Sequence, residues 1–61
     1  MYHYSVSFIK DNIFQVNQVK TYHDITMICY YFKQILGADK VLDVKDIRPD
    51  DIKPGMPVIE F

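Results

Sequence analysis

Few side chains in this sequence have the type and spacing needed for acid–base or nucleophilic chemistry. His23 and Asp24 are adjacent, but neighbouring residues of a helix point about 100° apart and do not face each other. Cys29, the one cysteine, falls on an apolar helix stripe, where a buried thiol is inert rather than nucleophilic. The sequence therefore predicts no catalytic residues, and we expect a protein that is not an enzyme.

A group of acidic residues in the second half of the chain could in principle bind a hard cation. Its members are Asp43, Asp46, Asp50 and Asp51. Their spacing lacks the glycine-containing pattern of a calcium-binding loop, and lysine and arginine residues are interleaved with them. A solvated turn with local ion pairs accounts for such a cluster. The sequence predicts neither a metal site nor a cofactor, because one cysteine and two distant histidines form no ligand pattern.

Length and charge narrow the classes of partner. The chain has 61 residues, enough for one domain, with 7 basic against 8 acidic residues. This balance argues against nucleic-acid binding, which normally needs a basic surplus. The sequence shows no signal-peptide pattern and no apolar run of roughly 18 residues, so we expect a cytoplasmic protein without a membrane partner. A domain this small is usually stabilised by disulfides, a metal or oligomerisation, and here we expect oligomerisation or docking onto a partner.

Residues 2–9 and 13–20 alternate between apolar and polar, which predicts a hairpin of two strands. A two-residue loop would set Phe8 opposite Gln15, whereas a three-residue loop sets Phe8 opposite Phe14. The three-residue loop also sets Val6 opposite Val16. We predict this second register, because it keeps apolar side chains on one face of the sheet.

The segment from Thr21 to Gly37 has the signals of a helix. Thr21 and Asp24 have the spacing of a capping box, and Gly37 stands where a left-handed C-terminal cap belongs. The apolar residues between them recur at helical spacing and predict a stripe that faces a core. This stripe consists of Ile25, Ile28, Cys29, Phe32, Ile35 and Leu36.

Residues 40–45 read as a third strand, with Leu42 and Val44 inward. A right-handed crossover would lay this strand beside the first. The predicted fold is a single α+β domain over residues 1–61, with β-β-α-β order, an antiparallel three-stranded sheet of order 2-1-3 and one face covered by the helix. Residues 56–61 could form a short fourth edge strand, cover the helix or exchange between subunits. The predicted open face of the sheet carries His3, Ser5, Ser7, Gln15, Asn17, Asp43 and Lys45.

The side of the helix opposite the core stripe carries the candidate partner-binding residues Met27, Tyr30, Tyr31 and Gln34. Three of these four side chains are large and at least partly apolar, and tyrosine and methionine are common in interfaces. A tail packed over the helix would also explain them. We expect a small non-enzymatic accessory or regulatory protein that binds a copy of itself or a larger protein. The alternatives are a nucleic-acid-binding module that uses the open sheet face and a small enzyme whose site forms between subunits.

Overall fold

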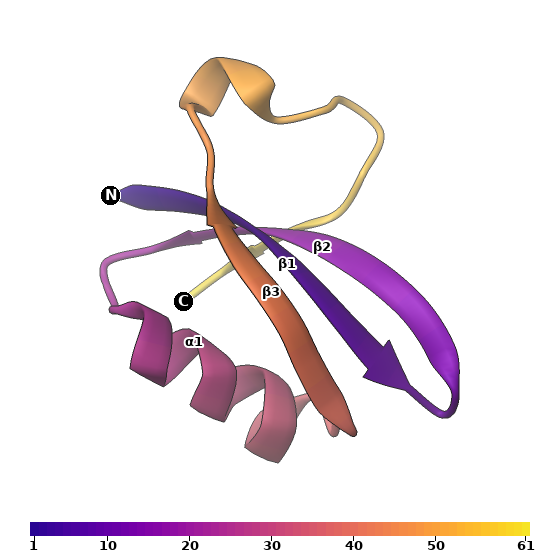
Figure 1. Ribbon diagram of the computed structural model, residues 1–61. Coiled ribbons are helices and arrows are strands. Elements are labelled where there is room, and N and C mark those ends of the chain that lie inside the picture. Colours follow the sequence, from indigo (N-terminus) through magenta and orange to yellow (C-terminus); the bar gives the residue numbers. More distant parts are fainter.

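The computed structural model describes all 61 residues and shows one helix packed under a four-stranded sheet (Figure 1). The hairpin strands are β1 (Tyr2–Lys10) and β2 (Ile13–Thr21), and they are followed by α1 (Ile25–Tyr30). This helix continues directly into the π-helical turn η1 (Tyr31–Ile35). The remaining elements are β3 (Lys40–Asp46), the 3-10 turn η2 (Pro49–Asp51) and β4 (Val58–Glu60).

The strand order is β3-β1-β2-β4. The first three strands are antiparallel, which confirms the α+β class and the predicted order 2-1-3. The fourth strand pairs parallel to β2, so the complete sheet is mixed. No helix of the chain is long and apolar enough to cross a membrane.

The hairpin register predicted from the apolar pattern is wrong. Phe8 pairs with Gln15 and Val6 with Asn17, and the loop has only two residues. Asp11 and Asn12 both have positive φ, 53° and 61°, as a type I′ turn requires. This turn matches the right-handed twist of the strands, and its backbone preference outweighs the apolar pairing.

The corrected register changes the side of the sheet on which the β2 side chains lie. Gln15 and Asn17, predicted on the open face, pair with inward-facing residues of β1 and lie on the helix side. Their places on the open face are taken by Phe14, Val16 and Gln18. Phe14, predicted to lie in the core, is therefore 62% exposed.

The core lies between the sheet and the helix. Its buried apolar residues are Tyr4, Val6, Phe8, Val19, Ile28, Phe32 and Ala38. The rings of Phe8 and Phe32 meet edge to face, with centroids 5.1 Å apart. Such a contact between sheet and helix buries two large apolar side chains, so it fixes how the helix sits on the sheet.

The helix begins at a different cap from the one predicted. Asp24 is the N-cap, and its carboxylate accepts a hydrogen bond of 2.9 Å from the Met27 amide. Thr21, the predicted cap, instead accepts a hydrogen bond of 3.0 Å from the His23 amide within a local turn. Gly37 has a φ of 76° just beyond the helix, as its predicted role at the C-terminus requires.

The π-helical turn alters the predicted core stripe. Ile28 and Phe32 are buried, Leu36 packs against the core and Cys29 is half-buried. Ile35, predicted to face the core, is 62% exposed. Each residue of a π turn advances by a smaller angle than in an α-helix, so by the end of η1 Ile35 is rotated away from the sheet. Ile25, at the first position of the helix, is exposed as well.

An irregularity also shifts the third strand. Val44 packs against the core as predicted, but Leu42 is exposed. The register between β1 and β3 slips between Ser7 and Phe8, so Val41 rather than Leu42 pairs with Phe8. A β-bulge of this kind adds one residue to one strand and changes the face of those beyond it.

The C-terminal segment both extends the sheet and covers part of the helix. β4 is an edge strand, and the Phe61 amide donates a hydrogen bond of 3.3 Å to the carbonyl of Lys20. The Phe61 ring then stacks on Tyr31, with centroids 4.1 Å apart and an angle of 11° between the planes. It also stacks on His23 at 5.6 Å. Residues 56–61 therefore combine two of the predicted roles, because they form a short edge strand and cover part of the helix.

Candidate functional site

The helix face predicted to bind a partner is divided by the C-terminal segment. Met27, Tyr30 and Gln34 are exposed. Tyr31 lies apart from them, half-buried beneath Phe61 and in edge-to-face contact with Phe32 at 6.0 Å. Tyr31 therefore belongs to the packing between the helix and the tail, and the exposed part of the predicted site is formed by the other three residues.

A larger apolar surface surrounds the start of the helix. Two shallow hollows of about 530 and 590 Å³ adjoin there, because Asp24 and Thr26 line both. We call this region the tyrosine surface. Its large exposed side chains are Tyr2, Tyr22, Ile25, Met27 and Tyr30.

Sequence reasoning missed three members of the tyrosine surface. By strand alternation Tyr2 shares the face of Tyr4, Val6 and Phe8, but it lies at the very start of β1 and is exposed. Ile25 was assigned to the core by helical spacing. Tyr22 precedes the helix cap, and its position in a connecting segment was the available signal, because binding residues often lie in such segments.

Two carboxylates influence the buried tyrosine of this surface. Burial is the main cause that raises the pKa of Tyr4 above its ordinary value of 10.0, and the carboxylate of Asp46 raises it further. Tyr2 and Asp24 act on that pKa in the same direction. The aromatic hollow at the start of the helix thus has two carboxylates around its buried tyrosine.

The pKa of Tyr4 predicts a loss of stability in alkali. An acid whose pKa is raised by folding contributes its stability fully below the unfolded pKa and loses it as the pH rises through the folded pKa. We expect the free energy of unfolding to fall as the pH rises above about 10, and Tyr4→Phe to reduce this fall. Urea unfolding at about pH 9 and about pH 11.5 measures the difference. An equal fall in the variant would contradict the role of Tyr4.

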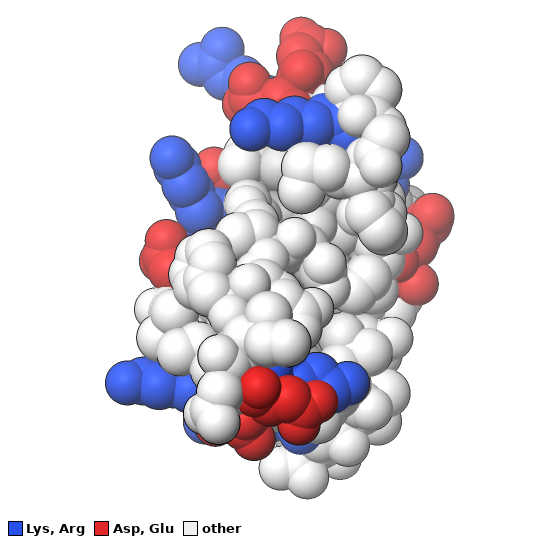
Figure 2. Space-filling view, turned by 90° about the vertical axis from the view of Figure 1, so that its right-hand side faces the viewer, with Lys and Arg blue, Asp and Glu red and all other residues white.

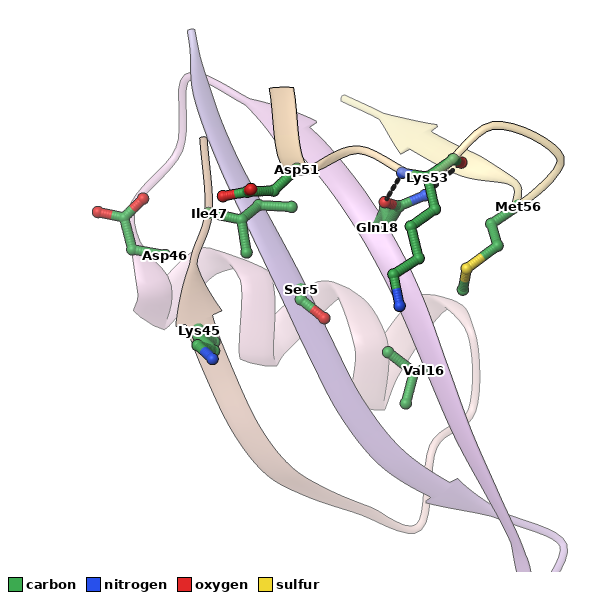
Figure 3. A pocket seen from close by; sticks show the side chains of 9 residues that line it. All are labelled: Ser5, Val16, Gln18, Lys45, Asp46, Ile47, Asp51, Lys53 and Met56. Carbon is green, nitrogen blue, oxygen red and sulfur yellow. Dashed lines mark hydrogen bonds between the residues drawn. The ribbon is translucent and has the colours of Figure 1, made fainter. Parts of the chain in front are cut away.

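A second candidate site lies on the open face of the sheet, under the segment 47–57 (Figure 3). This hollow, which we call the loop hollow, has a volume of about 410 Å³. It is lined by Ser5, Val16, Gln18, Lys45, Asp46, Ile47, Asp51, Lys53 and Met56. Ser5 and Lys45 lie on the open face, as predicted.

Gln18 holds the covering segment against the sheet. Its side-chain oxygen accepts a hydrogen bond of 2.7 Å from the Lys53 amide, and its side-chain nitrogen donates one of 3.4 Å to the Lys53 carbonyl. The pair resembles one rung of a β-ladder, in which a side-chain amide replaces the backbone of a neighbouring strand. Because Gln18 is only 4% exposed, these two bonds satisfy a buried polar group.

The other sequence candidates have structural roles in this fold. His23 stacks on Phe61, and Asp24 caps the helix. Asp51 accepts a hydrogen bond of 3.1 Å from the Arg48 amide at the start of η2. No group of three or more histidine, cysteine or acidic residues is arranged to hold a metal ion.

Figure 2 shows the side of the molecule that lies at the right of Figure 1, and neither basic nor acidic side chains predominate on it. Uncharged side chains occupy its middle, and basic and acidic side chains lie together towards its top and bottom. A strand of phosphates needs a continuous basic track, and this side offers none.

No protein-family model, curated protein or solved structure matches this chain.

Proposed function

We propose that this protein acts without catalysis, by binding another protein through the tyrosine surface, and that a second copy of the chain is the partner. The observation that carries the proposal is the gathering of five large, partly apolar side chains around the start of one helix. A monomer gains nothing by exposing such a patch to water, whereas an interface buries it.

The charges along the helix favour a second copy. Asp24 stands at the start of α1, and Lys33 stands in the last turn of η1. If two copies pack their helices antiparallel, the acidic start of each helix lies towards the basic end of the other. A two-fold interface requires this self-complementarity, since the same patch contributes both halves.

Replacing Tyr30 by aspartate is the test of self-association. The wild-type chain should show a mass that rises with concentration in light scattering across a dilution series. Tyr30→Asp places a charge within the proposed interface and should weaken association by at least about tenfold, a loss of about 1.4 kcal/mol. Far-UV circular dichroism should remain that of the wild type, because Tyr30 is exposed.

Phe14→Asp is the matched control. It makes the same change from an aromatic ring to a carboxylate at an exposed position, but on the open face of the sheet. We expect this variant to associate as the wild type does. A wild-type chain that stays monomeric at every concentration, or equal loss of association in both variants, would contradict self-association through the tyrosine surface.

Nucleic-acid binding is the second candidate function, and the exposure of Phe14 favours it. An exposed aromatic ring on an open sheet face can stack on a base. Binding of a labelled single-stranded oligonucleotide that falls steeply with salt and is lost in Phe14→Ala would support this function. Binding that the substitution leaves unchanged would count against it.

A further inference from the structure

The loop hollow is a built concavity rather than a gap between loose segments. Its floor is the open face of β1, β2 and β3, and its roof is the segment that Gln18 holds in place. Its volume of about 410 Å³ lies within the range of about 300 to 1,000 Å³ found for small-molecule sites. The hollow is separate from the tyrosine surface, and no residue lines both.

Two ammonium groups and one hydroxyl face this hollow. Figure 3 shows the Lys53 side chain running from the roof towards the floor, while Ser5 and Lys45 rise from neighbouring strands. Ser5 and Lys45 are register partners, so their side chains leave the sheet on the same face. None of the hydrogen bonds formed by side chains involves either ammonium group.

The lining also contains two carboxylates, and only one of them is directed away from the hollow. Asp46 pairs with Tyr4, so its side chain belongs to the helix side of the sheet, and in Figure 3 it points away from the hollow. Asp51 lines the hollow, and one of its oxygens accepts the hydrogen bond from the Arg48 amide. Two ammonium groups therefore face the hollow together with the one carboxylate of Asp51.

Apolar side chains complete the lining. Val16 comes from the floor, and Ile47 and Met56 come from the two ends of the covering segment. A site with an apolar wall and a few convergent polar groups selects a ligand that has both characters. We propose that the loop hollow binds a small organic anion, with its phosphate or carboxylate group between Lys45, Lys53 and Ser5 and its apolar body against Val16 and Met56.

The test is a titration of the full chain, followed by the backbone amide signals in NMR, at about 0.15 M salt. Phenyl phosphate and benzoate are the anionic probes, and benzyl alcohol is the neutral one. At least one anionic probe should shift the amides of Ser5, Val16 and Lys53, and benzyl alcohol should not. The anion that binds with the higher affinity shows whether the site prefers a phosphate or a carboxylate group. Absence of any shift, or equal shifts with benzyl alcohol, would overturn the proposal.

Two lysine variants and one matched control test whether the ammonium groups of Lys45 and Lys53 bind the anion. Lys53→Met and Lys45→Met keep the aliphatic stem and should each weaken binding of the anionic probe by about five- to tenfold. Lys40→Met makes the same change at the far end of β3, beyond a screening length of about 8 Å, and should leave the affinity within about twofold. Equal losses in all three variants would mean that net charge alone attracts the anion.

Inorganic phosphate tests the apolar wall. It should bind more weakly than phenyl phosphate, and equal affinity would overturn the assignment of an organic ligand. The test is independent of self-association. Tyr30→Asp should bind the anionic probe as the wild type does, and Lys53→Met should associate as the wild type does. Failure of one proposal therefore leaves the other standing.

Discussion

Truncation of Phe32 to alanine is expected to unfold a large fraction of the chain at room temperature. Phe32 is fully buried, and its ring contacts Phe8 across the core. Removing a buried phenylalanine costs about 3–5 kcal/mol, and a domain of this length has a total stability of roughly 3–9 kcal/mol. Urea unfolding followed by circular dichroism measures the difference.

The matched control for Phe32→Ala is Ile35→Ala in the same π-helical turn. Ile35 is 62% exposed, so its truncation should change the free energy of unfolding by no more than about 0.5 kcal/mol. In a regular α-helix Ile35 would lie on the core stripe and its loss would be costly. A cost for Ile35→Ala close to that for Phe32→Ala would contradict the rotation that the π turn introduces.

Replacing Gln18 by alanine should release the segment 47–57 from the sheet. The substitution leaves the Lys53 amide and carbonyl without their partners, which we expect to cost about 1–3 kcal/mol. The Lys53 amide should exchange its hydrogen much faster than in the wild type, and binding of phenyl phosphate should be lost together with the roof of the loop hollow. Hydrogen exchange and the probe titration measure the two effects.

Gln15→Ala is the corresponding control. Gln15 lies on the same strand, is half-buried and makes no side-chain hydrogen bond, so its loss should leave exchange at Lys53 unchanged. Slow exchange at Lys53 in Gln18→Ala would show that other contacts hold the segment. Self-association should survive in both variants, because neither residue belongs to the tyrosine surface.

The elements of the fold could be predicted from the sequence because each has a strong local signal. The alternation in residues 2–9, the helix and its end at Gly37, and the position of the third strand beside the first all agree with the structure. The hairpin register could not be obtained from apolar pairing, because the backbone preference of Asp11 and Asn12 for positive φ decided it.

The candidate sites were only partly predictable, for physical reasons. Met27, Tyr30 and Gln34 are exposed as expected, but Tyr31 is covered by the Phe61 ring, and the π turn leaves Ile35 exposed. No spacing rule for a regular helix reveals a π turn. The loop hollow depends on Gln18 meeting the backbone of Lys53, 35 residues away along the chain, and such a contact leaves no local pattern in a sequence.

The bulge near Leu42 has a consequence for aggregation. β3 forms one edge of the sheet, and an unpaired edge can template the addition of further strands. The bulge interrupts the regular spacing of its outward-facing backbone groups, and Lys40, Asp43 and Lys45 place charges along it. Both features oppose the stacking of chains edge to edge into fibres. The proposed association through the helix would close after two copies, so it would bury the apolar surface without starting a polymer.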